Sequence, residues 1–308
     1  MSLAFVFPGQ GSQSIGMMNG WGDLAVIKAT FDEASGVLGQ DLWALVQEGP
    51  IEALNATVNT QPVMLTAGVA AWRAYVASGG MMPSVLAGHS LGEYTALVAA
   101  EAISFGDALQ LVRLRAEEMQ EAVPAGVGAM AAVLGLSDEL TVEACVEAAQ
   151  GDVVQAVNFN SPGQVVIAGN KAAVERACEA CKTRGAKRAM LLPVSVPSHC
   201  DLMRPAAAKL ASKLAAIQIH APIIPVLHNA DVAAYSDADL IRDALVRQLY
   251  QPVRWVETVQ KMSSDGVLVI AECGPGKVLA GLNKRIAANA QQFVITDTAT
   301  LESLIAVL

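Results

Sequence analysis

The chain has 308 residues and a mass of 32.0 kDa; 53% of the residues are hydrophobic and 16% are charged. This composition excludes a disordered chain, and the length is enough for one large domain, or for a main domain that carries a smaller one. The mean hydropathy of +0.42 comes from alanine-rich helix faces. No uninterrupted apolar run approaches the ~18 residues that a membrane-spanning helix needs.

The chain is acidic, with 20 Lys and Arg against 29 Asp and Glu and a net charge of −9. We therefore expect neither nucleic acid nor an anionic membrane as a partner, and an anionic partner would need a local basic patch. The first ten residues, MSLAFVFPGQ, lack a basic region and are interrupted by Pro8 and Gly9, unlike a signal peptide. These features predict a cytoplasmic protein.

Five cysteines, an odd number without secretory features, predict reduced thiols rather than a disulfide framework. Cys178 and Cys181 have the spacing of a redox pair. However, they lie inside a run with helical periodicity instead of at the start of a helix, which favours structural thiols.

The first part of the chain alternates short apolar strands with amphipathic helices. We predict strands at 3–7 and 84–87, and helices at 61–77, 91–101 and 106–122. This alternation predicts a parallel sheet covered by helices on both faces.

After Pro124 the pattern changes to β-α-β-β-α-β, the order of a ferredoxin-like unit. The predicted elements are strands at 129–134, 153–159, 164–168 and 187–192, and helices at 137–150 and 171–183. We expect residues 125–197 to form a small inserted domain.

The α/β pattern returns after Pro197. We predict helices at 201–217, 239–249 and 256–262, strands at 223–227 and 267–271, and a last helix that ends at 288. The expected fold class is α/β, with a larger α/β-hydrolase-like domain built from 1–124 and 198–308. The cleft between the two domains is the expected ligand site.

The residues GHSLG at 88–92 lie between a predicted strand and a predicted helix, the setting of a nucleophile elbow. Small residues flank Ser90 because the turn is sharp, and the following helix directs backbone N–H groups at the same point. Ser90 is the candidate nucleophile; the alternative is a glycine-rich turn with an idle serine.

The chain offers four histidines as a base for Ser90. His89 is one step along the elbow and should point elsewhere, and His220 and His228 flank a strand, where a packing role is expected. His199 lies in a proline-fixed loop between the domains and is the only one placed at the cleft. We therefore take His199 as the candidate general base.

Six motifs together resemble the bacterial malonyl-CoA:acyl carrier protein transacylases. They are FVFPGQGSQ at 5–13, GHSLGE at 88–93, QEAVP at 120–124, NFNSPG at 158–163, PSH at 197–199 and GPGK at 274–277. The resemblance covers almost the whole chain, and a chain of this length looks like the discrete enzyme rather than a domain of a larger synthase.

The resemblance implies that Ser90 accepts the acyl group, that His199 is its base and that Arg115 holds the malonyl carboxylate. A planar guanidinium suits this role because it binds a carboxylate through two hydrogen bonds. The alternative for Arg115 is a solvated helix arginine, which we expect for the neighbouring Arg113.

The resemblance also implies an oxyanion hole made by the backbone N–H groups of Gln10 and Leu91, where glycines around Gln10 allow close approach. Gln248 matches the residue that accepts the proton on the far side of the imidazole. Since no acidic residue takes that place, a Ser-His dyad with an amide or carbonyl orienter is implied.

The implied reaction is ping-pong acyl transfer from malonyl-CoA, through malonyl-Ser90, to the phosphopantetheine thiol of acyl carrier protein in fatty acid biosynthesis. It implies no metal and no organic cofactor, and we expect a monomer. The spacing of Cys and His shows no zinc pattern.

An acidic carrier protein would need basic residues near the cleft. Two groups are candidates, with ordinary solvated faces as the alternative. The first is Lys182, Arg184, Lys187 and Arg188 in the small domain; the second is Lys277, Lys284 and Arg285 in the large domain.

Three other functions remain open at this point. A serine esterase or thioesterase would use the same elbow, but would ordinarily place an acidic residue between Ser and His in chain order. The acyltransferase of a polyketide pathway shares the elbow and the histidine. A non-enzymatic carrier-binding protein is disfavoured by the intact dyad.

Overall fold

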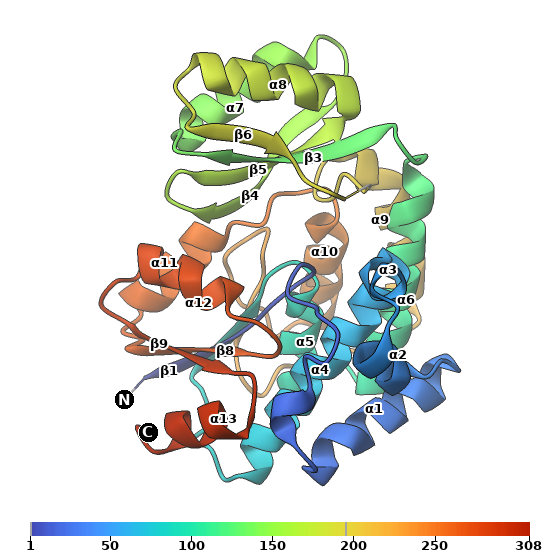
Figure 1. Ribbon diagram of the computed structural model, residues 1–308, viewed down its shortest axis with the longest axis vertical. Helices are drawn as coiled ribbons and strands as arrows, with labels where there is room; N and C mark the ends of the chain where they lie inside the picture. Colours follow the sequence, from blue (N-terminus) through green and yellow to red (C-terminus); the bar gives the residue numbers. More distant parts are fainter. Residues whose placement is uncertain (1, 195) are drawn as a thin grey trace.

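The computed structural model describes residues 2–194 and 196–308 and contains two separate sheets, one above the other in Figure 1. The larger sheet is parallel, with the order β7-β2-β1-β8-β9. Its strands are β7 (Val226–Leu227), β2 (Val85–Gly88), β1 (Leu3–Phe7), β8 (Val269–Cys273) and β9 (Gln291–Ile295). Because β1 lies between β2 and β8, both ends of the chain build this sheet.

Alternation along β1 divides the large domain into two cores. Leu3, Phe5 and Phe7 point into the larger core, while Ala4 and Val6 point into the smaller one. The larger core is built with α1 (Ala25–Leu38), α2 (Leu42–Glu48), α3 (Ile51–Asn55), α4 (Thr57–Ala77), α5 (Gly92–Ala99), α6 (Phe105–Ala122), α9 (Arg204–Ala215), α10 (Ala238–Gln248) and α13 (Thr298–Ile305); the smaller is built with α11 (Trp255–Ser264) and α12 (Val278–Ile286). The predicted helix-covered parallel sheet is confirmed.

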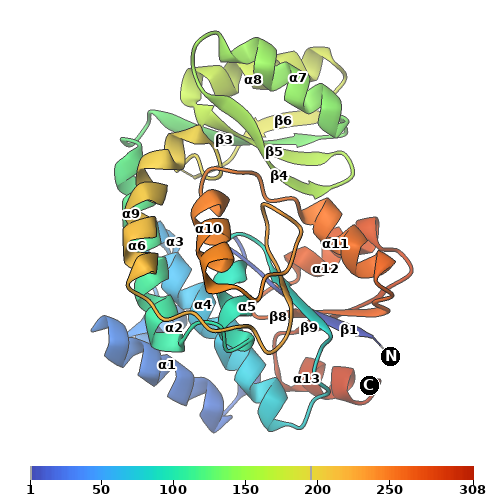
Figure 2. The ribbon, with the colours of Figure 1, turned by 180° about the vertical axis from the view of Figure 1, so that it is seen from behind.

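The second sheet is antiparallel and has the order β4-β5-β3-β6. It consists of β3 (Gly128–Leu134), β4 (Val154–Ser161), β5 (Gln164–Asn170) and β6 (Arg188–Leu191), with α7 (Asp138–Ala149) and α8 (Lys171–Thr183) on the face that points away from the large domain (Figure 2). Ala131 and Val133 pack under these helices, whereas Met130 packs on the opposite face against Cys200. The β-α-β-β-α-β order matches the prediction.

Backbone hydrogen bonds join the small sheet to the large domain. Val253 donates to the carbonyl of Val157 at 2.8 Å, and Phe159 donates to the carbonyl of Val253 at 3.0 Å. These bonds hold β4 beside the segment that leads into α11. The domain boundaries at 124/125 and 197/198 stay a prediction.

Some elements differ from the prediction. The strand expected at 223–227 is only Val226–Leu227, since Pro222 and Pro225 have no N–H to donate to a ladder. The helix expected at 201–217 begins as a 3₁₀ turn, Asp201–Met203, before α9. Helices α1 to α3, strand β9 and helix α13 were not predicted. No helix in the described part of the chain is long and apolar enough to cross a membrane.

Candidate active site

The turn between β2 and α5 presents Ser90 with its backbone in the left-handed region, at φ 51°. For a residue other than glycine this conformation costs about 1–3 kcal/mol, and it is typical of functional turns. The flanking glycines are a packing requirement. A Cβ on Gly88 would lie 1.8 Å from the carbonyl carbon of Gly92, and a Cβ on Gly92 would lie 2.0 Å from the carbonyl oxygen of Phe7.

The hydroxyl of Ser90 faces the imidazole of His199. The distance from Ser90 Oγ to His199 Nε2 is 2.8 Å, and His199 Nδ1 lies 2.7 Å from the backbone carbonyl oxygen of Gln248. Since a carbonyl only accepts, Nδ1 carries the proton and Nε2 presents its lone pair to the hydroxyl. His199 is itself left-handed, at φ 67°, and its N–H donates to the carbonyl of Leu249 at 3.0 Å.

Burial, and then the charge of Arg115, lower the pKa of His199 from its ordinary value of 6.5 to about 3. The imidazole is therefore neutral near pH 7. A neutral imidazole in this tautomer can accept a proton from Ser90 Oγ, which is the geometry of nucleophilic catalysis.

Arg115 enters the site from α6 with only 1% of its surface exposed. Its Nη1 donates to Gln61 Oε1 at 2.8 Å, and its Nη2 donates to Gln248 Oε1 at 3.1 Å and to Ser90 Oγ at 3.2 Å. Within residues 2–194 and 196–308 no carboxylate makes an ion pair with it. Burial lowers the pKa of Arg115, but from so high a value that the guanidinium stays charged. The site thus holds a buried cation suited to a carboxylate ligand.

The neighbouring Arg113 is placed differently. It lies two residues earlier on α6 and donates to Gln40 Oε1 instead of reaching Ser90. Arg113 is half-buried rather than solvated as expected, and its Nε is buried without a partner among the described residues. The two arginines therefore compare a residue that reaches Ser90 with one on the same helix that does not.

A cavity of about 290 Å³ lies at Ser90 and is lined by loops and helices of the large domain and by strands of the small sheet. Gln10 and Leu91 lie on its wall, and among the described residues the backbone N–H of neither donates to another protein group. Other lining residues are Gln61, His89, Ser90, Arg115 and Met119 from the large domain, and Met130, Asn158, Val166 and Leu192 from the small one. The oxyanion role of Gln10 and Leu91 stays a prediction.

The other three histidines do not contact the hydroxyl of Ser90. His89 also lines the cavity, so the expectation that only His199 lies at the cleft is wrong. His89 Nε2 lies 2.8 Å from Asn160 Oδ1 on β4, so this ring points to the small domain. His220 is exposed, and His228 is buried with Nδ1 2.7 Å from Glu93 Oε1. Of the four, only His199 contacts Ser90 Oγ.

All five cysteines are buried and unpaired. Burial raises the pKa of Cys178 to about 11, so this thiol is protonated near pH 7 and poorly reactive. In the ranges that the structure describes, no cluster of three or more His, Cys, Asp or Glu side chains is placed to hold a metal ion.

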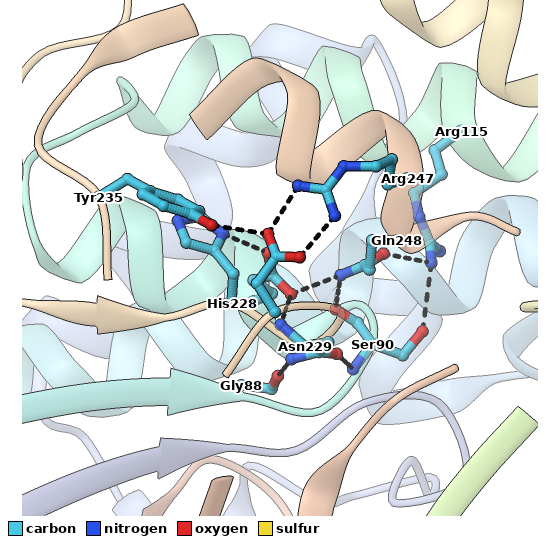
Figure 3. A network of polar contacts seen from close by, with 10 residues as sticks. Gly88, Ser90, Arg115, His228, Asn229, Tyr235, Arg247 and Gln248 are labelled. Atoms are coloured by element: carbon cyan, nitrogen blue, oxygen red, sulfur yellow. Dashed lines mark hydrogen bonds and ion pairs between the residues drawn. The ribbon is translucent and has the colours of Figure 1, made fainter. Parts of the chain in front are cut away.

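Reasoning from the sequence missed four polar residues around Ser90, of which His228 and Asn229 are labelled in Figure 3. Gln61 contacts Arg115 from α4, while Glu93, His228 and Asn229 form a buried group beneath the elbow. Glu93 belongs to the GHSLGE motif, which was the one available signal. The side chains of the others form hydrogen bonds with partners 54 to 141 residues away in the chain, and no spacing pattern points to them.

Comparison with known proteins gives a consistent result. The acyl transferase domain family matches residues 4–296. A malonyl CoA-acyl carrier protein transacylase from Salmonella typhimurium is 57% identical over 302 residues, which cover 98% of each chain. The chain belongs to the malonyl CoA-acyl carrier protein transacylases, within the acyl transferase family. The resemblance predicted from the six motifs is therefore confirmed.

Solved structures of other transacylases share the fold along their full length. An acyl-carrier-protein S-malonyltransferase from Burkholderia pseudomallei has a TM-score of 0.98 and 57% identity, covering 99% of this chain and 100% of the other. A malonyl-transacylase solved with its type II polyketide synthase acyl-carrier protein has a TM-score of 0.98 and 55% identity, covering 100% of both chains. The predicted fold class of this transacylase family member is confirmed.

The lowered pKa of His199 predicts the pH dependence of the reactivity of Ser90. A base works only when deprotonated, so inactivation by the neutral reagent phenylmethanesulfonyl fluoride should persist well below pH 6.5 and fall only as the pH approaches the pKa of His199. Arg115→Ala removes one cause of the lowering, so the acid limb of the rate profile should move to higher pH. Arg113→Ala should leave the limb in place. An acid limb near 6.5 in all three proteins would contradict this account.

Proposed function

We propose that this protein transfers a malonyl group from malonyl-CoA to the phosphopantetheine thiol of acyl carrier protein, through a malonyl-serine intermediate at Ser90. The transfer supplies malonyl units for fatty acid biosynthesis. One observation carries the choice of substrate: a buried guanidinium, which has no carboxylate partner among the described residues, lies 3.2 Å from the hydroxyl that faces the base. Membership in the transacylase family supports the same reaction.

In the first half-reaction, His199 Nε2 accepts the proton of Ser90 as Oγ attacks the thioester carbon of malonyl-CoA. The tetrahedral oxyanion receives hydrogen bonds from the N–H groups of Gln10 and Leu91. Collapse breaks the C–S bond, and His199 returns the proton to the departing sulfur. Coenzyme A leaves as a thiol, and malonyl-Ser90 remains.

The second half-reaction runs the same steps in reverse with a different thiol. His199 accepts the proton of the phosphopantetheine thiol, whose sulfur attacks the malonyl-serine ester. The C–O bond breaks, and the proton passes from His199 to Ser90 Oγ. A thioester donor, a thiol acceptor and the protein's own side-chain and backbone groups account for every step, so we propose that no metal or organic cofactor takes part. We also propose that the reaction occurs in the cytoplasm.

Hydrolysis is the competing function, since an esterase would use the same elbow. The orienter of His199 is a backbone carbonyl rather than the acidic residue that an α/β-hydrolase ordinarily supplies. Arg115 also favours a charged acyl group. A polyketide carrier stays an alternative acceptor, because the transacylase solved with such a carrier is 55% identical. Assaying malonyl transfer and malonyl-CoA hydrolysis, with and without holo-carrier of either kind, separates these functions.

The assignment of Ser90 as the nucleophile predicts the effect of removing its hydroxyl. Ser90→Ala should fold normally and form no adduct with malonyl-CoA, because the acyl-accepting oxygen is gone. His199→Ala should retain the oxygen but acylate orders of magnitude more slowly. Intact-protein mass spectrometry measures the adduct, and Ser84→Ala, directly before β2 and outside the cavity, is the control. A malonyl mass increase that persists in Ser90→Ala would overturn the assignment.

Arg115 should set the preference for a charged acyl group. Arg115→Ala leaves the malonyl carboxylate desolvated without a partner, a loss of about 2–5 kcal/mol by analogy with truncated buried charge pairs. Acetyl-CoA lacks that carboxylate and should lose far less. Rates of acyl-enzyme formation with both thioesters measure the ratio, and Arg113→Ala is the matched control on α6. Equal losses for malonyl and acetyl would show that Arg115 has only a structural role.

For carrier docking we propose the exposed basic residues Lys284 and Arg285 on α12, together with Lys187 and Arg188 at the start of β6. Arg285 donates to Gln164 Oε1 on β5 at 3.0 Å, so it lies where the large and small domains meet. Lys182 and Arg184 belong to the outer helical layer instead. Lys182 forms an ion pair with Glu179 at 2.7 Å, and Arg184 forms one with Glu147.

Charge reversal tests this docking surface. Lys284→Glu with Arg285→Glu should raise the KM for holo-carrier about tenfold at low salt, because an acidic partner is repelled. The rate of acylation by malonyl-CoA should change less. Added salt should bring the KM of the variant for holo-carrier closer to the wild-type value, because it screens the charges. Lys182→Glu with Arg184→Glu is the matched control on α8. Carrier kinetics that are the same in both double variants would refute the site and leave the catalytic assignment untouched.

A further inference from the structure

The reaction described above makes no use of Glu93, although its carboxylate is completely buried beside the site. Glu93 lies in the first turn of α5, three residues after Ser90. Its Oε1 is 2.7 Å from His228 Nδ1; its Oε2 accepts from the backbone N–H of Asn229 at 2.9 Å and from Gln248 Nε2 at 3.0 Å. One carboxylate oxygen thus holds two residues that both reach Ser90.

Those two residues hold the peptide groups on either side of Ser90. Asn229 Oδ1 accepts from the N–H of Ser90 at 2.7 Å, and Asn229 Nδ2 donates to the carbonyl of Gly88 at 2.6 Å. Gln248 Nε2 donates to the carbonyl of Ser90 at 2.9 Å. Figure 3 shows these bonds converging on the elbow. They are made by side chains from the chain after β7 and from α10, and they stabilise the left-handed conformation at Ser90.

Glu93 also determines which way the amide of Gln248 points. A carboxylate only accepts hydrogen bonds, so the amide nitrogen must face Glu93 and the amide oxygen must face away. The oxygen then accepts from Arg115 Nη2 at 3.1 Å. A reversed amide would place an NH₂ group against the guanidinium and an oxygen against the carboxylate. The orientation of Arg115 therefore depends on an acceptor at the position of Glu93 Oε2.

The outer side of this group is held firmly. The ring of Tyr235 stacks on His228 with a centroid distance of 5.4 Å, and Tyr235 donates to Asp231 at 3.0 Å. Asp231 in turn forms an ion pair with Arg247 at 2.5 Å, one residue before Gln248 on α10. The contacts tie α5, the segment after β7 and α10 into one unit.

We propose that Glu93 is a positioning residue, whose Oε2 acts through Asn229 and Gln248 to hold Ser90 in its reactive backbone conformation and Arg115 in its carboxylate-binding orientation. The proposal rests on the proposed function, because it assigns a supporting role in that reaction. It makes a specific distinction: the acylation rate and the malonyl preference depend on the placement of an acceptor oxygen, and not on the negative charge of Glu93.

Two conservative substitutions separate oxygen placement from charge. Glu93→Gln removes the charge but keeps an oxygen that can accept from Asn229 and Gln248. The new amide nitrogen can donate to His228 Nδ1 once the imidazole proton moves to Nε2, which has no partner among the described residues. Glu93→Asp keeps the charge but withdraws the oxygens by one methylene, so the contacts to Asn229 and Gln248 lengthen.

We expect Glu93→Gln to acylate with malonyl-CoA within about threefold of the wild-type rate, and to keep the wild-type preference for malonyl over acetyl. Glu93→Asp should acylate at least tenfold more slowly with malonyl-CoA, through kcat more than KM, and its malonyl preference should fall because Arg115 is no longer oriented. Rates are measured on the full chain by rapid quench and mass spectrometry. Circular dichroism and thermal unfolding establish the folded fraction.

The control is Glu272 on β8, a second fully buried carboxylate, whose Oε2 accepts from the N–H of Ala280 on α12. Glu272→Asp should lower the melting temperature without altering the ratio of malonyl to acetyl rates. Loss of folded protein alone lowers both rates equally, so the ratio distinguishes positioning from stability.

Two results would overturn the inference. Glu93→Gln losing as much activity as Glu93→Asp would show that charge is the determinant, and an unchanged malonyl preference in Glu93→Asp would show a purely structural role. Failure of the proposed function would be seen separately, as a wild-type protein that forms no malonyl adduct at Ser90.

Discussion

The arrangement of the site depends on burying the guanidinium of Arg115, which no carboxylate contacts directly in the part of the chain that the structure describes. A buried cation carries a desolvation penalty of several kcal/mol unless polar groups satisfy its donors. Here Gln61, Gln248 and Ser90 accept three of its hydrogen bonds, and the ring of Tyr94 lies 5.6 Å away. These neutral oxygens accept three hydrogen bonds without cancelling the charge, and the buried Nε has no partner among the described residues. The site therefore retains an attraction for an anionic acyl group.

The hydrogen bonds of Gln248 connect the groups of the site to one another. Its backbone carbonyl orients His199, its amide nitrogen contacts the carbonyl of Ser90 and its amide oxygen contacts Arg115. Nucleophile, base and cation are thus held by one residue at the end of α10. Glu93 accepts from the amide nitrogen of Gln248 and so fixes the direction of that amide. It does so from beneath the elbow, where it leaves the cavity free.

The sequence predicted the features that follow local rules. Glycines at 88 and 92 signal a turn in which backbone segments approach closely, and the switch to β-α-β-β-α-β order after Pro124 signals a second sheet. It did not predict the residues that only tertiary contact brings together. Gln61 reaches Arg115 from 54 residues away, and Asn229 reaches Ser90 from 139 residues away. The ion pair of Arg184 with Glu147 was likewise invisible to a count of basic residues, since it depends on how α7 and α8 pack. The pair of Lys182 with Glu179 lies within α8, at a spacing of three residues.

The charge of Arg115 has two opposing effects on the proposed reaction, and binding of the proposed substrate removes one of them. In the proposed reaction Arg115 pairs with the malonyl carboxylate, but its charge also lowers the pKa of His199 and so weakens the base proposed for Ser90. When a malonyl carboxylate pairs with Arg115, its negative charge offsets the guanidinium and removes one of the causes of that lowering. The imidazole then becomes a stronger base at the moment when Ser90 must lose its proton. A neutral acyl group brings no such compensation, so recognition of the carboxylate and activation of the nucleophile are parts of a single electrostatic arrangement.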